Sequence, residues 1–139
     1  MLTEHQILEI REHLEKAQNP IFFYDNDADG LCSFVLLRRF IGRGKGVAVR
    51  SFPDLNASYA RKVRELNSDY VFVLDKPVIS REFVEEIGKL NLPIVWIDHH
   101  DIPSGEFADE FKNFFQYNPA KSGDMKGEPV TYLCYRVCE

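Results

Sequence analysis

The sequence predicts an α/β domain with a doubly wound, mainly parallel sheet. Short apolar runs alternate along the chain with segments that carry apolar residues at helical spacing. The runs are apolar at consecutive positions, as strands are when helices cover both faces of a parallel sheet. With 139 residues, the chain has the length of a single domain. We therefore expect one Rossmann-like domain with the strand order 2-1-3-4-5.

Capping residues mark the ends of the expected helices. Thr3 and Gln6 match a capping box, and Asn19-Pro20 should end the helix that opens there. Gly42 should end the second helix, because glycine readily adopts the left-handed conformation that follows a last turn. The helices expected after the first one span residues 31–41, 59–66, 81–90 and 130–137.

Five apolar runs predict the strands. They span residues 21–24, 47–49, 70–74, 93–97 and 114–117. The first, third and fourth runs are each followed at once by an aspartate, namely Asp25, Asp75 and Asp98. In an open parallel sheet, ligands bind beyond the carboxyl ends of the strands, where the strand order reverses. We expect these three strand ends to share one crevice.

Carboxylates and histidines gather at these strand ends. In chain order they are Asp25, Asp27, Asp29, Asp75, Asp98, His99, His100 and Asp101. A single aspartate after a strand is usually a turn residue or a helix cap. Three acidic strand ends in one crevice would repel one another without a cation. Carboxylates with one or two imidazoles suit Mn²⁺ or Mg²⁺, with Zn²⁺ as an alternative.

Charge and cysteine usage narrow the class of protein. The formal net charge is −5, so bulk charge does not explain binding to nucleic acid, and a phosphate partner requires a local site. The three cysteines do not form a disulfide framework, and a cytoplasmic location fits them best. Residues 1–15 are charged, unlike a signal peptide, and no run is long enough to span a membrane.

The motifs resemble those of the DHH family of phosphoesterases, most closely its RecJ-like and notably archaeal branch. Residues 25–30 resemble the first family motif, Asp75 the second, and Asp98-His99-His100 the third, which names the family. Asn118-Pro119 and residues 128–133 are also similar to RecJ-like proteins, so the resemblance covers about residues 21–137. Many members begin the first motif with histidine, where this chain has Asp25.

The resemblance implies a site for two divalent ions, usually Mn²⁺, and hydrolysis by attack of water on phosphorus. The implied metal ligands are Asp27 for one ion, Asp29 for the other, Asp75 between both, and His99. The implied catalytic residues are His100, at a metal or at the scissile phosphate, with Asp25 and Asp98, which would complete or orient the ligand shell.

The chain departs from the family after its third motif. The fourth acidic motif and the second domain of catalytic members are missing, so residues 1–139 correspond to a DHH domain truncated before them. The leading function is a RecJ-like exonuclease of single-stranded nucleic acid, with poor hydrolysis by this chain alone. The alternatives are a small-nucleotide or oligonucleotide phosphoesterase, and a weak or inactive replication scaffold that associates with GINS.

Several weaker signals complete the expectations. Arg43 and Lys45 belong to a basic segment that either binds a phosphate backbone or follows the favourable location of cations at helix carboxyl ends. Cys32 should be buried and His13 should lie on the surface. The apolar face of the last helix has little of the domain left to bury it, which predicts self-association there; this face comprises Val130, Leu133, Cys134 and Val137.

Overall fold

The sheet has the predicted order and direction. The computed structural model describes residues 1–50, 55–101, 110–124 and 126–139. All five strands are parallel, in the order β2-β1-β3-β4-β5. In chain order they are β1 (Pro20–Asp25), β2 (Lys45–Val49), β3 (Tyr70–Leu74), β4 (Ile94–Ile97) and β5 (Phe114–Tyr117). From β1 the chain first adds β2 on one side and then β3, β4 and β5 on the other, so the direction of strand addition reverses between β1 and β3, as in a doubly wound fold.

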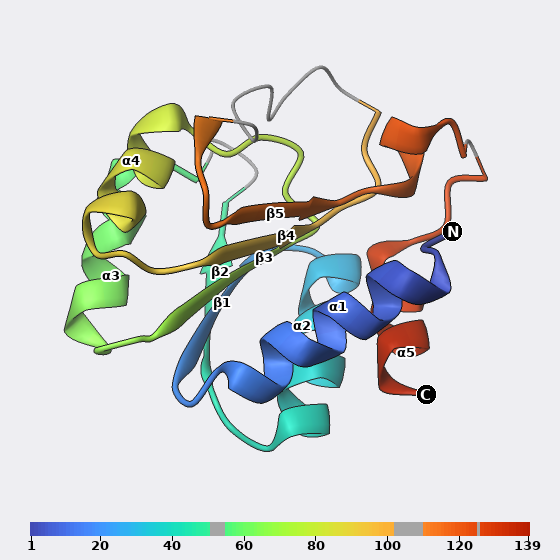
Figure 1. Ribbon diagram of the computed structural model, residues 1–139, viewed down its shortest axis with the longest axis horizontal. Helices are drawn as coiled ribbons and strands as arrows, with labels where there is room; N and C mark the ends of the chain where they lie inside the picture. Colours follow the sequence, from blue (N-terminus) through green and yellow to red (C-terminus); the bar gives the residue numbers. More distant parts are fainter. Residues whose placement is uncertain (51–54, 102–109, 125) are drawn as a thin grey trace.

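Helices cover both faces of the sheet (Figure 1). One face carries α1 (Glu4–Lys16), α2 (Ala28–Ile41) and α5 (Val130–Cys138). The other carries the 3-10 turn η1 (Ala57–Tyr59), α3 (Ala60–Glu65) and α4 (Arg81–Lys89). A further 3-10 turn, η3 (Pro119–Ser122), follows β5. None of the helices in the described ranges combines the length and apolar character needed to cross a membrane.

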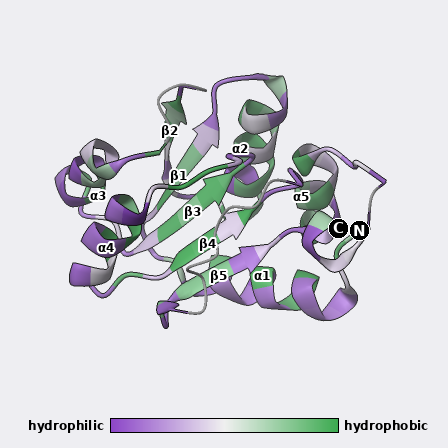
Figure 2. Cartoon of the chain, turned by 90° about the horizontal axis from the view of Figure 1, so that it is seen from above, coloured by the Kyte–Doolittle hydropathy of each residue, from purple (hydrophilic) through white to green (hydrophobic). Residues whose placement is uncertain are grey.

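The core consists of two apolar layers, one on each side of the sheet. Successive residues of a strand point to opposite faces, so Phe22 packs under α1 and α2 while Phe23 packs under α3 and α4. Figure 2 shows the central strands as the most apolar part of the chain, with polar residues on the outer helices. This burial on both faces explains the continuous apolar runs of the sequence.

The first acidic motif is built into the start of α2. The helix begins at Ala28, before the expected Leu31, because the Asp27 side chain caps it by accepting a hydrogen bond from the Gly30 N–H at 2.8 Å. Gly30 packs so closely under β1 that an added Cβ would lie 2.1 Å from the backbone oxygen of Asp25. Only glycine fits there, which fixes the aspartates against the end of β1.

The expected exposed face of the last helix is buried, so that prediction was wrong. All four residues of the face are at most 1% exposed, because α2 and α1 pack over them: Val130, Leu133, Cys134 and Val137. The exposed apolar residues of α5 are Tyr132 and Tyr135, whose rings stack on each other. Self-association through the predicted face therefore loses its physical basis.

Two smaller predictions also differ from the structure. Cys32 is exposed on α2. His13 is half-buried, because its Nδ1 lies 2.6 Å from the Tyr70 hydroxyl and its ring packs on Phe115. In the part of the chain that the structure describes, this histidine links α1 to the sheet and does not contact the acidic strand ends.

Candidate metal centre

The carboxyl ends of β1, β3 and β4 lie side by side, as the strand order predicts. Backbone hydrogen bonds continue just beyond the strands, from the Asp75 N–H to the Ile97 carbonyl and from the Asp98 N–H to the Tyr117 carbonyl. These bonds hold the first residue after each strand in a defined position. Asp25, Asp75 and Asp98 are consequently buried, with exposed fractions of 8%, 2% and 1%.

Asp75 is held in an unusual backbone conformation at the centre of the site. Its φ is 63°, in the left-handed region that non-glycine residues rarely adopt. Its Oδ1 atom is buried and has no hydrogen-bond partner among the described residues. A strained residue with an unsatisfied buried carboxylate oxygen is typical of a binding site.

His99 presents a lone pair to that unsatisfied oxygen. Its Nδ1 lies 2.9 Å from the backbone carbonyl of Glu128, which can only accept, so Nδ1 carries the proton in the neutral ring. The unprotonated Nε2 then lies 3.2 Å from Asp75 Oδ1. Two electron-rich atoms at this separation require a cation or a shared proton, and a histidine anchored through its other nitrogen is the usual arrangement of a metal ligand.

Burial and neighbouring negative charge make ionisation of Asp75 unfavourable. Burial and the neighbouring carboxylates of Asp29, Asp27 and Asp98 raise the pKa of Asp75 to about 8. At neutral pH the metal-free site therefore holds a proton at the position that suits a cation. A divalent ion would reverse this balance, because ligand carboxylates bind metal in their charged form.

Two groups of ligand-type side chains meet at the site, and they share Asp75. One group contains Asp75, Asp98, His99 and His100, and the other contains Asp25, Asp27 and Asp75. Within each group the ligand atoms lie within 4.8 Å of one another. The first group offers imidazole and carboxylate ligands, whereas the second offers carboxylates alone. Each group could hold a divalent cation, and Asp75 is a member of both.

His100 is oriented by Asp98. Its Nδ1 lies 2.6 Å from Asp98 Oδ1, and its backbone N–H donates to Asp98 Oδ2 at 3.2 Å. The hydrogen bond to Asp98 raises the pKa of His100 despite partial burial. Asn118 donates to the His100 carbonyl at 3.0 Å and fixes the backbone. Among the described residues Nε2 of His100 has no hydrogen-bond partner, so it can serve as a proton donor to an anion or as a metal ligand.

Asp29 contacts the helix α5 as well as the site. Its carboxylate accepts hydrogen bonds from the backbone N–H groups of Val130 and Thr131, at 3.1 and 2.7 Å. Its Oδ2 lies 3.8 Å from His99 Nε2, but Asp29 belongs to neither of the two groups described above. Its expected role as a ligand of one ion stays a prediction, and Asp25, expected to complete or orient the ligand shell, is a member of the carboxylate group.

The two basic residues expected at a phosphate are far from this site. Lys45 begins β2 and therefore lies at the amino edge of the sheet, opposite the acidic strand ends. The Arg43 guanidinium donates hydrogen bonds to the backbone carbonyls of Leu14, Glu15, Ala17 and Ile41. Arg43 thus stabilises the carboxyl end of α1. This agrees with the second explanation of the basic segment, the favourable location of cations at helix carboxyl ends.

Lys76 is part of the site and was assigned no role from the sequence. It is completely buried, and its ammonium lies 3.5 Å from Asp25 Oδ1. The one sequence feature that points to a role for Lys76 is its position directly after Asp75 at a strand end. Sequence alone does not reveal burial of a lysine, because lysine side chains usually extend to solvent.

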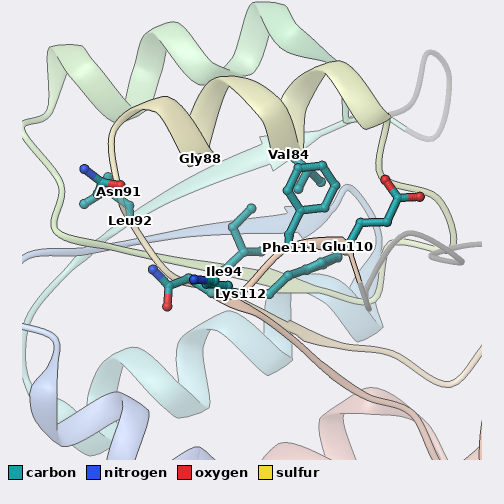
Figure 3. Close-up of a pocket in the computed structure, with 10 residues that line it drawn as sticks. Val84, Gly88, Asn91, Leu92, Ile94, Glu110, Phe111 and Lys112 are labelled. Carbon is teal, nitrogen blue, oxygen red and sulfur yellow. The ribbon is translucent and has the colours of Figure 1, made fainter.

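A separate hollow lies between α4 and the amino ends of β4 and β5 (Figure 3). Its volume is about 240 Å³. Both apolar and polar side chains line it, and the labelled residues are Val84, Gly88, Asn91, Leu92, Ile94, Glu110, Phe111 and Lys112. The hollow is at the opposite end of the strands from the acidic residues, so it is not part of the candidate metal centre.

Solved structures share this fold. The chain aligns over 99% of its length with an exonuclease RecJ bound to manganese, with a TM-score of 0.74 and 17% identity. RecJ in complex with Mn²⁺ from Thermus thermophilus aligns over 96%, with a TM-score of 0.70 and 17% identity. CDC45 from Entamoeba histolytica aligns over 97%, with a TM-score of 0.60 and 19% identity. The chain spans only 37%, 19% and 28% of these three chains.

Sequence comparison identifies the family. A comparison with curated proteins found no match. A family model described as the N-terminal domain of the DHH family matches residues 21–135, from the first residues of β1 into α5. This range contains all the acidic strand ends and both histidines of the candidate metal centre. The chain therefore belongs to the DHH family, of which it carries the N-terminal domain.

Proposed function

We propose that this domain binds two divalent cations and contributes to the hydrolysis of phosphodiester bonds. The observation that carries the proposal is that Asp75, buried and strained, is common to both groups of ligand-type residues. Mn²⁺ is the expected ion, because the matched RecJ structures hold manganese and the donor set is mixed oxygen and imidazole. Mg²⁺ and Zn²⁺ are the alternatives.

The chemistry of such a centre is the activation of water and the neutralisation of charge on phosphate oxygens, when the ions are bound. His99 and Asp75 serve as ligands from one side, with Asp25 and Asp27 on the other. His100, held by Asp98 and with a raised pKa, donates a hydrogen bond to the phosphate. Asp98 fixes the orientation of the His100 ring and compensates its positive charge.

The proposed substrate is single-stranded nucleic acid, attacked from an end, as the likeness to an exonuclease RecJ suggests. A small nucleotide or short oligonucleotide shares the same phosphodiester and is the alternative substrate. This chain spans only 37% and 19% of the two matched RecJ chains. We expect slow hydrolysis by the 139-residue chain alone.

A second candidate function is a replication scaffold that associates with GINS and has weak or no activity. The fold shared with CDC45 favours this alternative. The two candidates differ in their use of the site: a scaffold does not need a complete set of metal ligands. Retention of both ligand groups therefore supports the enzymatic candidate.

The testing experiment is a hydrolysis assay with end-labelled single-stranded DNA and RNA and added Mn²⁺. We expect Mn²⁺-dependent release of mononucleotides that is lost in Asp75→Asn. Glu65→Gln is the matched control, because Glu65 is exposed and forms an ion pair with Lys62 on α3, away from the acidic strand ends. Activity that persists in Asp75→Asn would contradict the assignment of this site.

A further inference from the structure

Lys76 is the only lysine or arginine that is fully buried among the residues the structure describes. Its Nζ donates to the backbone carbonyl of Arg50 at 3.0 Å and lies 3.5 Å from Asp25 Oδ1. Its own carbonyl accepts a hydrogen bond from the Trp96 indole at 2.8 Å. The side chain and backbone are thus both fixed. A charge in such a place interacts strongly with its neighbours, because little water screens it.

The ammonium of Lys76 acts on one of the two ligand groups. It contacts Asp25, which belongs to the group of Asp25, Asp27 and Asp75. No contact joins it to His99 or His100 among the described residues. The carboxylate group therefore has a fixed, buried ammonium beside one of its ligands, whereas in the imidazole group the charge that His100 can carry is paired with Asp98.

We propose that Lys76 makes the two cation positions unequal by weakening the one formed by carboxylates. This inference rests on the proposed function, since it requires that both positions bind metal. A carboxylate that is already paired with an ammonium attracts a divalent ion less, and the ammonium itself repels that ion. The position with His99 then fills first, and the position with Asp25 and Asp27 holds its cation weakly.

Unequal affinity has a consequence for the reaction. A weakly held cation exchanges with solvent and is bound more tightly when an anionic phosphate adds its own negative charge. Lys76 thereby couples occupation of the carboxylate position to the presence of substrate. It is a positioning residue, because it acts through Asp25 and its buried ammonium does not reach the surface of the site.

The test is Mn²⁺ binding by calorimetry and by electron paramagnetic resonance of free Mn²⁺, without substrate. The parent should bind one ion tightly and a second weakly. Lys76→Met should lower the dissociation constant of the second Mn²⁺ about tenfold, the scale expected for removing one charge several ångströms away. The dissociation constant of the first Mn²⁺ should not change. Lys76→Gln, which keeps a donor for the Arg50 carbonyl, should act in the same direction. Lys62→Met changes the net charge equally at an exposed position and should have no effect.

The outcomes separate the inference from the proposed function. If the parent binds no Mn²⁺, the proposed function and the inference both fail. If the parent binds Mn²⁺ and neither Lys76 variant tightens the second ion, only the inference is overturned. Weaker binding of the second ion in the folded variants would also overturn it, because Lys76 would then act by holding Asp25 in place. Circular dichroism of each metal-free variant identifies those that fold.

Discussion

Asp29 and Thr131, which are 102 residues apart, are joined by two short hydrogen bonds: Asp29 Oδ1 accepts from the Thr131 N–H at 2.7 Å and from its hydroxyl at 2.6 Å. The helix α5 has Pro129 at its N-cap position, where no side chain caps it. Asp29 therefore supplies from the first motif the negative charge that the start of α5 requires. This contact connects the last helix to the candidate metal centre.

The first prediction follows from this contact. Thr131→Val removes the hydroxyl and should lower the free energy of unfolding by about 1–2 kcal/mol, the range for a lost cap or a hydrogen bond to a charged group. Thr131→Ser keeps the hydroxyl and should remain close to the parent. Urea denaturation followed by circular dichroism measures both. Equal stability of the valine and serine variants would show that the hydroxyl contributes little.

A second prediction concerns the close packing of Gly30 under β1. Gly30→Ala places a Cβ against the backbone of Asp25 and should cost about 3 kcal/mol or more, through strain or displacement of the first motif. Gly88 in α4 is a matched control, because nothing lies within 4 Å of an added Cβ. Gly88→Ala should raise stability by about 0.5–1 kcal/mol. A tolerated Gly30→Ala in thermal denaturation would contradict the described packing.

The third prediction concerns pH. Because the pKa of Asp75 is raised to about 8 in the folded metal-free protein, the folded state retains a proton that the unfolded state loses near pH 4. The contribution of Asp75 to stability should therefore decline as pH rises from about 4 to 8 and then level off. The pKa of His100 is also raised in the folded protein, so its contribution to stability likewise declines as pH rises above the pKa of an unfolded histidine.

Urea unfolding of the metal-free protein between pH 5 and 9 measures this dependence. Asp75→Asn should flatten the curve and leave the smaller part due to His100. Saturating Mn²⁺ should reverse the slope, because the ion binds the deprotonated carboxylate. A metal-free stability that rises with pH across this window would contradict the assignment of a buried, uncompensated Asp75.

A fourth prediction separates the two histidines. His99→Gln should weaken Mn²⁺ binding by about tenfold or more, because its free Nε2 faces Asp75. His100→Gln should mainly weaken the binding of inorganic phosphate to the Mn²⁺-loaded protein, because His100 is tied to Asp98 and presents its outer nitrogen. Calorimetry with Mn²⁺ and then with phosphate measures both effects. Identical behaviour of the two variants would remove this division of roles.

Much of the fold follows from the sequence because its strands are buried on both faces. The five apolar runs became the five strands, and the expected strand order correctly predicted which strand ends meet. The start of α2 was placed too late, because the apolar periodicity begins at Leu31 while Asp27 caps the helix earlier. An aspartate can be both a cap and a candidate ligand, and periodicity does not distinguish the two.

The errors came from contacts between distant segments. The apolar face of α5 is buried by α2 and α1, and nothing near residues 130–137 in the sequence reveals that packing. Arg43 was grouped with a phosphate patch, although its guanidinium binds carbonyls of α1. Lys76 received no role because its burial depends on Trp96 and Arg50, which meet it only in the folded chain.

The most direct test of the central claim is thermal denaturation of the parent and of Asp75→Asn, each with and without Mn²⁺. In the proposed function Asp75 is a ligand of both cations, and without a cation its buried, ionised carboxylate is unfavourable. Asparagine is neutral without taking up a proton, so Asp75→Asn should raise the Tm of the metal-free protein at neutral pH, while Mn²⁺ should raise the Tm of the parent but not that of the variant. A metal-free variant that is less stable than the parent, and that is still stabilised by Mn²⁺ to the same extent, would contradict the account of Asp75 as the shared ligand of a two-cation centre.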